Sequence, residues 1–386
     1  MEKNVIYLDN NATTCIAPEV VEAMLPYLTS FYGNPSSIHS FGGQIYKKIE
    51  DSRESLAALL NCYADELVFT SCGTESDNAA IASSLKMDSL RKKIVTTKVE
   101  HPAIMGPCKK WQSLGYSVEY CPVDQMGRLR LDVLSDMIDN TTALVSIMWA
   151  NNETGTIFPI HEIAEIAHSH GALFHTDAVQ AVGKIPIDLK ESNIDFLSLS
   201  GHKFHAPKGI GALYIKRHTK FSPFMLGGHQ EKGLRAGTEN VPSIIGIGKA
   251  AEIAAEHIKN DLNNIAKLRD ELEQKLISTC PDVRINGDKE KRVSNTTNIS
   301  FEYIEGESIL MMLNMHGIAA SSGSACTTGS LEPSHVLRAM NVPYTAAHGS
   351  IRFSLSHYTT QKEINKVLEV TPMIVKRLRE ISPYGK

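Results

Sequence analysis

Closely spaced cysteine pairs are missing from this sequence. Its seven cysteines are odd in number and widely spaced, and they include no Cys-x-x-Cys motif. Structural zinc sites usually take ligands from such pairs, and disulfide frameworks usually have an even set of cysteines. The pattern therefore argues against both. It favours free thiols in a reducing compartment, which we expect to be the cytoplasm.

A membrane span, a signal peptide and a strong basic excess are missing as well. The best candidate span, residues 244–255, is interrupted by Lys249 and Glu252. The first fourteen residues, MEKNVIYLDNNATT, lack the basic-then-apolar order of a signal peptide. The formal net charge is only −4, so the sequence has no excess of positive charge that would favour binding to nucleic acid. We expect a protein that binds neither membranes nor nucleic acids.

The 386 residues, 42% of them hydrophobic, are enough for two soluble domains. From about residue 66 to 215, short apolar runs alternate with stretches of helical length. This alternation predicts an α/β fold with a mostly parallel sheet flanked by helices. The predicted strands cover residues 66–71, 93–97, 117–121, 143–149, 172–176, 196–200 and 211–215.

The pattern changes near Ile244. Residues 244–279 are typical of one long helix, and the rest alternates strands (297–301, 350–355) with helices (307–315, and from Thr360). We therefore expect a large domain over residues 16–255. A smaller α+β domain would comprise residues 256–386 together with residues 1–15.

Polar residues follow several predicted strands, at the sheet edge where α/β proteins bind ligands. Gly73 and Thr74 lie between a strand and a helix, where free backbone N–H groups bind anions. Thr74 could instead be an ordinary helix cap with Asp77 three residues on. His101 precedes a helix that Pro102 would start. A lone histidine at such a junction is more often an ordinary surface residue.

Two later strands end in residues that are uncommon beside buried strands. Asp177 closes one strand, with Gln180 three residues on, and Lys203 follows another strand through Ser200 and His202. A buried carboxylate needs a cation or donors, and a partly buried lysine becomes a nucleophile or imine former. With Thr74 and His101, this set matches the needs of pyridoxal phosphate: a lysine, a carboxylate for the ring nitrogen and donors for the phosphate.

Cys326 lies in a run of small polar residues, SSGSACTTGSLEPSH (321–335). A buried structural cysteine would have apolar neighbours, and a zinc ligand would have a partner two to four residues away. Neither description fits. The glycines at 323 and 329 predict a mobile loop over about 321–332, and a mobile thiol suits a nucleophile that must enter and leave a site.

These residues belong to motifs that resemble those of pyridoxal-phosphate-dependent cysteine desulfurases of the NifS/IscS type, in wording most similar to NifS. The more specific motifs are RAGTEN (235–240), SSGSACTTGS (321–330), EPSHVLRAM (332–340) and SIRFSLS (350–356). Motifs shared with other enzymes of fold type I are YLDNNATT (7–14), GNPSS (33–37), TSCGTESDN (70–78), VEHPAI (99–104), ANNETGT (150–156), HTDAVQ (175–180) and SGHKFHAPKG (200–209).

The resemblance implies a fold-type-I transferase with a seven-stranded large-domain sheet, and it implies site roles. Lys203 would bind the cofactor covalently and His101 would stack on its ring. Cys326 would be the nucleophile, and Arg352 would bind the substrate carboxylate. The remaining implied cofactor contacts are Gly73, Thr74, Asn152, Asp177, Gln180, Ser200, His202 and Thr238. Asn152 would also lie near the substrate, and Asn34 would line the substrate mouth.

The resemblance further implies the reaction and its partners. Sulfur would pass from L-cysteine to Cys326 as a persulfide, with release of L-alanine, and then to an iron–sulfur scaffold protein. Nitrogenase clusters are one implied destination. Thr238 would reach the cofactor of a second subunit, which implies a homodimer. No metal is implied for catalysis, apart from transient contact of Cys326 with a nascent cluster.

Other functions remain open at this point. An aminotransferase, a kynureninase-like hydrolase or a selenocysteine lyase of the same fold type would share Asp177 and Lys203. Of these, only some lyases need a thiol on a flexible loop. A metal-carrying protein without pyridoxal phosphate is disfavoured because the cysteine spacings do not pair ligands.

Overall fold

The computed structural model describes residues 5–260, 262–323 and 332–383. A seven-stranded sheet forms its centre, in the order β2-β8-β7-β6-β5-β3-β4. Strands β3 to β7 are parallel to their neighbours within this set, whereas β8 is antiparallel to both β7 and β2. The strands are β2 (Leu67–Thr70), β3 (Lys93–Thr97), β4 (Ser117–Cys121), β5 (Thr142–Ser146), β6 (Leu173–Asp177), β7 (Phe196–Ser200) and β8 (Gly211–Ile215).

Nearly every residue of these strands is buried, because helices cover both faces of the sheet. This explains why the strands read as continuous apolar runs, and the predicted mostly parallel α/β sheet is confirmed. The helices of this part are α1 (Pro18–Thr29), α2 (Ser40–Leu60), α3 (Gly73–Met87), α4 (Pro102–Ser113), α5 (Leu131–Met137), α6 (Ile160–Ser169) and α7 (Val241–Asn260), with 3₁₀ turns η1 (Ala64–Glu66), η2 (Gly201–Lys203) and η3 (Gln230–Gly233).

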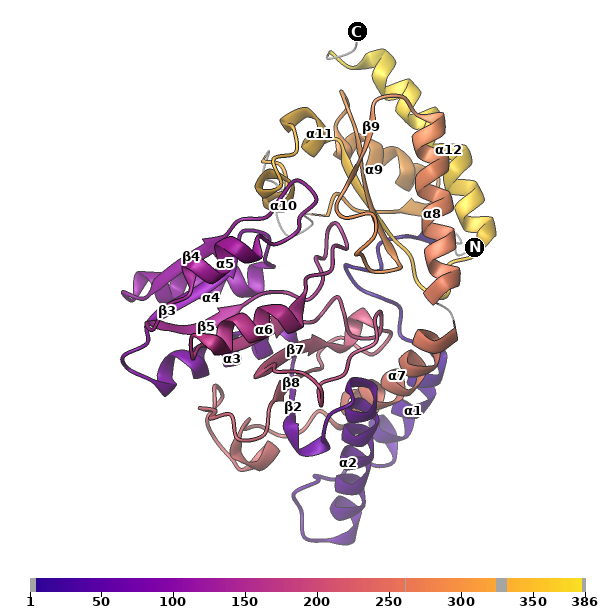
Figure 1. The fold of residues 1–386 in the computed structure, drawn as a ribbon. Coiled ribbons are helices and arrows are strands. Elements are labelled where there is room, and N and C mark those ends of the chain that lie inside the picture. The colour runs from indigo at the N-terminus through magenta and orange to yellow at the C-terminus, as the bar shows by residue number, and fades with distance from the viewer. Residues whose placement is uncertain (1–4, 261, 324–331, 384–386) are drawn as a thin grey trace.

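A smaller unit carries an antiparallel three-stranded sheet, in the order β12-β10-β9, packed against helices (Figure 1). Its elements are α8 (Leu262–Thr279), β9 (Val283–Asn286), β10 (Thr296–Phe301), α9 (Gly306–Met315), β11 (Ile318–Ala319), α10 (His335–Ala339), α11 (Tyr344–His348), β12 (Ser350–Ser354) and α12 (Gln361–Ile381). The final helix begins after Thr360, whose hydroxyl accepts from the Glu363 N–H as a cap. The predicted long helix over 244–279 is described as two helices, α7 and α8, on either side of residue 261.

The N-terminal segment joins the smaller unit. Strand β1 (Ile6–Tyr7) pairs in parallel with β11, and Leu8 is fully buried in the same apolar cluster as Phe353. Asp9 forms a bridge with Ser354 at the end of β12. The chain then runs from Asn10 toward the carboxyl edge of the large sheet, which brings the N-terminal residues between the two sheets.

Candidate active site

A cavity of about 300 Å³ lies at the carboxyl edge of the large sheet, where the smaller unit and the N-terminal segment meet it. Such edges are the usual ligand sites of α/β folds. The predicted residues that line the cavity are Gly73, Thr74, His101, Asn152, Asp177, Gln180, Ser200, His202, Lys203 and Arg352. The fold thus brings together predicted residues that are spread over almost 280 positions of the sequence.

Three predicted residues are not placed in this cavity. Asn34 and Thr238 are exposed and do not line it in the single chain. Cys326 and the predicted mobility of its loop lie outside the described residues. The roles expected for these residues remain predictions.

Asp177 closes β6 with its carboxylate almost fully buried. Its Oδ1 accepts from the Val179 N–H at 2.9 Å. Burial raises the pKa of this carboxyl, and the neighbouring His101 and Lys203 only partly offset that. A cation against the free side of Asp177 would restore its usual acidity, so the residue fits a protonated pyridine nitrogen.

The opposite end of the cavity fits a phosphate. Helix α3 begins at Gly73 with Cys72 as its N-cap, so the alternative that Thr74 caps this helix is wrong. A Cβ on Gly73 would lie 2.6 Å from Val179 Cγ2, so a larger residue would crowd this turn. The Ser200 hydroxyl is buried and has no hydrogen-bond partner among the described residues. A helix N-terminus and a free buried donor are what a phosphate group requires.

The two histidines of the cavity are both shifted toward their neutral forms. His101 caps α4, and its Nδ1 accepts from the Ala103 N–H at 3.2 Å, which leaves the neutral ring with its proton on Nε2. Burial lowers the pKa of His101. The pKa of His202 falls to about 4, first through burial and then through Lys203 and other lysines.

Lys203 ends the short turn η2 that follows β7. Its Nζ donates to the backbone carbonyls of Asn11 at 2.9 Å and Ala12 at 2.7 Å. The lysine is therefore held at the cavity by the N-terminal segment, which is almost two hundred residues away in the chain.

Asn11 is a site residue that the sequence reasoning missed. Its carbonyl accepts from Gln180 Nε2 at 2.9 Å, and its side chain contacts Thr296 at 2.8 Å. The motif YLDNNATT did not single out Asn11, because this segment forms no amphipathic element and follows no buried strand of the large sheet. No local signal marks it as part of the cavity.

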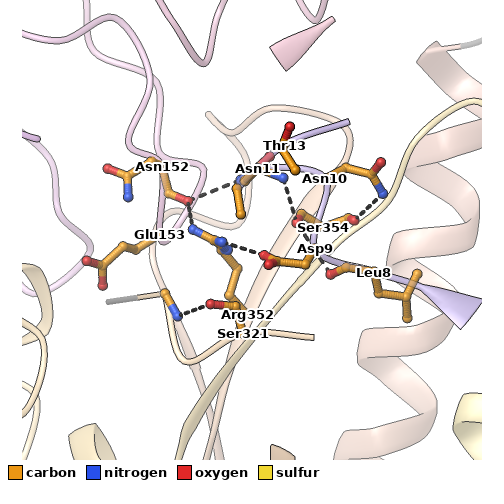
Figure 2. Close-up of polar contacts among 12 residues, drawn as sticks. Leu8, Asp9, Asn10, Asn11, Thr13, Asn152, Glu153, Ser321, Arg352 and Ser354 are labelled. Atoms are coloured by element: carbon orange, nitrogen blue, oxygen red, sulfur yellow. Dashed lines mark hydrogen bonds and ion pairs between the residues drawn. The ribbon is translucent and has the colours of Figure 1, made fainter. Parts of the chain in front are cut away.

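Arg352 lies on β12 with its side chain 3% exposed. Its Nη2 pairs with Asp9 Oδ1 at 2.6 Å, and its Nη1 donates to the Asn152 carbonyl at 2.9 Å (Figure 2). Among the described residues, its Nε has no hydrogen-bond partner. The guanidinium is thus fixed from two sides where it lines the cavity.

The described ends of the Cys326 loop also lie at the cavity. Ser321 exchanges backbone hydrogen bonds with Arg352 (Figure 2), and Gly323 lines the cavity with φ +86°. Glu153 is buried beside both ends, since a Cβ on Gly323 would meet its Oε2 at 3.2 Å and Ser334 donates to the same oxygen. Glu153 therefore binds the Ser334 end directly and leaves little room for a side chain at the Gly323 end.

Two further buried acids, one of them in the cavity lining, were also missed. Asp77 lines the cavity, with Oδ1 3.5 Å from His175 Nε2, and burial together with Asp177 raises its pKa well above the usual range. Burial raises the pKa of Glu100 to about 8 although Thr97 and the Met148 N–H donate to it. Within the described residues, no group of three or more His, Cys, Asp or Glu is placed to hold a metal ion.

The family model for class-V aminotransferases matches residues 6–367. The chain belongs to this family. A cysteine desulfurase of Trichormus azollae is 59% identical over 381 residues, which are 99% of this chain and 95% of the relative. Cysteine desulfurase NifS of Azotobacter vinelandii is 56% identical over 380 residues, 98% of this chain and 94% of the relative. The predicted membership of the cysteine desulfurase group is confirmed, and the cofactor of this family is pyridoxal phosphate.

Solved structures agree with this membership. A NifS-like protein superimposes with a TM-score of 0.91 at 37% identity, covering 97% of this chain and 100% of that one. SspA in complex with cysteine gives a TM-score of 0.80 at 33% identity, covering 92% of this chain and 100% of that one. The expected fold-type-I architecture is therefore confirmed. No helix in the described parts of the chain is both long and apolar enough to span a membrane.

Proposed function

We propose that this protein is a cysteine desulfurase that transfers sulfur from L-cysteine to Cys326 and releases L-alanine. The observation that carries the proposal is the single cavity in which Asp177, Lys203 and Arg352 meet beside the base of the cysteine loop. When bound on Lys203, pyridoxal phosphate supplies an electron-accepting ring that stabilises negative charge on the substrate Cα. The chain's own residues supply the rest.

The substrate would be held at its carboxylate end by Arg352. Asp9 and the Asn152 carbonyl fix the guanidinium before substrate enters, so that little side-chain freedom is lost on binding. The Asn152 side chain would lie beside the same substrate. His101, kept neutral by burial, can take and return a proton at the ring face.

The Cys326 thiolate would then attack the substrate sulfur. A sulfur–sulfur bond forms as the substrate carbon–sulfur bond breaks, and the carbon keeps that bonding pair and takes a proton to give alanine. Cys326 follows Gly323 by three residues, which is at most about 11 Å of chain. Gly323 itself lines the cavity.

The proposal includes a homodimer. Helices α1 and α2 and the segment before η3 expose apolar side chains, such as Leu28 at 60% and Leu226 at 84%. Thr238 lies near this region in the chain and does not line its own cavity, which suits a contact with a second subunit's phosphate. Asn34 follows α1 and would line the substrate mouth from the same side. A monomer in sedimentation at micromolar concentration would contradict this arrangement.

We further propose two domains, 16–255 and 256–386 with 1–15, because Leu8 belongs to an apolar cluster that is otherwise built from residues 265–378. The buried apolar residues of α10 and α11, such as Val336 and Ala346, pack in the cluster of the large domain instead, at the contact between the two. An iron–sulfur scaffold protein in the cytoplasm is the proposed sulfur acceptor. The six described cysteines are free thiols, which suits a reducing compartment. The NifS relative favours nitrogenase clusters as a destination. Deleting the gene and measuring nitrogenase against other iron–sulfur enzymes distinguishes that from general supply.

Alanine release from L-cysteine tests the enzymatic proposal directly. We expect L-cysteine-dependent alanine and sulfide formation that Cys326→Ala abolishes, while the buried-thiol control Cys108→Ala keeps it. Turnover of L-selenocysteine alone would instead indicate a selenocysteine lyase. Amino-group transfer to a keto acid at high turnover would indicate an aminotransferase. Full sulfide release by Cys326→Ala would overturn the assigned nucleophile.

A further inference from the structure

Lys184 is a buried lysine next to the cavity that the reaction described above does not use. It is 8% exposed, and its Nζ lies 3.0 Å from Asn11 Oδ1 and donates to Gln180 Oε1. Among the described residues, no carboxylate lies within 4.0 Å of this nitrogen. A buried ammonium without an anion is unfavourable, so its retention at this place needs a reason.

The charged groups that act on Lys184 are themselves positive. Burial, then Lys203 and Arg352, lowers the pKa of Lys184 well below its usual range. In turn its charge depresses the pKa of His202 and His205. Both forms of the Nζ group have N–H bonds to donate to Gln180, and the ammonium form has no lone pair with which it could accept.

This hydrogen bond fixes which way the Gln180 amide lies. The amide oxygen faces Lys184, because the opposite orientation would place that oxygen against the Asn11 carbonyl and the amide NH₂ against an ammonium that cannot accept. The Nε2 edge is therefore presented on the other side, where it donates to the Asn11 carbonyl at 2.9 Å. Lys203 Nζ donates to the same carbonyl at 2.9 Å, so the fixed edge lies beside the lysine that would bind the cofactor.

We propose that Lys184 is a positioning residue that holds the Gln180 amide with its N–H edge toward the cavity, so that a donor always faces the ring oxygen of bound pyridoxal phosphate. The inference rests on the proposed function, in which Gln180 contacts that oxygen. Without Lys184, the hydrogen bond to the Asn11 carbonyl is the one described contact left to orient the amide, so the amide could turn more readily and present its oxygen instead. A repulsive contact would then replace a hydrogen bond.

A purely structural role for Lys184, such as linking Asn11 to the turn after β6, would predict a different outcome. It would change stability but would leave the cofactor's electronic state alone. The pH midpoint of the visible absorbance of the holoenzyme reports that electronic state without any turnover. Donation to the ring oxygen stabilises its anionic form, so loss of the donor raises this midpoint.

The test titrates the absorbance of holoenzyme carrying Lys184→Met, with the exposed lysine variant Lys190→Met as the matched control. We expect the Lys184→Met midpoint to rise by about one pH unit and the control midpoint to stay unchanged. In a Gln180→Ala background, Lys184→Met should give less than about a third of that shift, because the residue acts through the amide. An unmoved midpoint, or an equal shift in both backgrounds, would overturn the inference.

A second variant covers the case in which Lys184→Met does not fold. Gln180→Glu would pair its carboxylate with Lys184 and present an acceptor to the cavity. We expect a raised midpoint in the holoenzyme, because the carboxylate has no N–H to donate. An unmoved midpoint in this variant would overturn the inference. A wild type without any cofactor absorbance would overturn the proposed function as well, whereas a normal band with an unmoved midpoint overturns the role of Lys184 alone.

Discussion

The cavity has two walls that are built in different ways. The sheet wall consists of Gly73, Thr74, Asp177, Gln180, Ser200, His202 and Lys203, which follow the buried strands β2, β6 and β7. The N-terminal wall consists of Asn11, Ala12, Gly323 and Arg352, and it is held by contacts such as Arg352 to Asp9, 343 residues apart. The sheet wall is positioned by strands and helix starts, whereas the N-terminal wall exists only when the smaller unit is in place.

This difference suggests that the two walls have different functions. The sheet wall offers the lysine, the carboxylate and the phosphate donors that a cofactor needs. The N-terminal wall offers the guanidinium and the base of the loop that a substrate and a nucleophile need. Changes in the sheet wall should therefore abolish the chemistry, and changes in the N-terminal wall should weaken substrate use while leaving the cofactor in place.

The largest effect is expected in the sheet wall. Lys203→Ala should lower alanine release by about 10³-fold or more, because the variant lacks both the covalent attachment and the proton carrier. The visible absorbance of lysine-bound cofactor should disappear with it. The exposed neighbour variant Lys208→Ala should keep both. Wild-type absorbance in Lys203→Ala would contradict the assignment.

A smaller effect is expected from the N-terminal wall. Arg352→Lys keeps the charge but loses the fork that Asp9 and Asn152 fix, so kcat/KM for cysteine should fall about 10- to 100-fold. Cofactor absorbance should stay unchanged, which separates the two walls. The half-buried variant Arg284→Lys on β9 is the control. Loss of cofactor from Arg352→Lys would show that the walls are not independent.

The acid limb of the pH profile tests His101, the cavity residue that caps α4. Burial lowers the pKa of His101 below 6.5, so the ring stays neutral and able to accept a proton as the pH falls below that value. The acid limb of kcat/KM should therefore lie below pH 6.5, and His101→Gln should remove it. A limb above pH 6.5 that disappears in His101→Gln would contradict the direction of this shift.

The smallest effect is expected at the loop base. Gly323 has a left-handed φ, and an added Cβ would also crowd Glu153, so Gly323→Ala should lower the free energy of unfolding by about 1–2 kcal/mol. Gly115 has a similar φ, and an added Cβ there would have nothing within 4 Å. Gly115→Ala therefore measures the stability cost of the left-handed backbone conformation alone. Denaturant unfolding measures both. Equal losses would show that the contact with Glu153 adds nothing.

The same difference explains what the sequence could predict. The sheet wall was predictable because continuous apolar runs mark the strands and polar residues such as Asp177 and Lys203 stand directly after them. Arg352 was assigned only through family resemblance, since no sequence pattern near β12 predicts its contact with Asp9. Asn11 and Lys184 were missed because their partners are set by tertiary packing, and one asparagine or lysine has no local pattern.

Sulfur transfer to Cys326 is the central claim, and a single turnover without reductant tests it most directly. Holoenzyme mixed with one equivalent of L-cysteine should release one equivalent of alanine. Peptide mass spectrometry should find one added sulfur atom on the peptide that contains Cys326 and none on the other cysteines. Alanine release with the sulfur on another cysteine, or with no sulfur bound to the protein, would contradict the account.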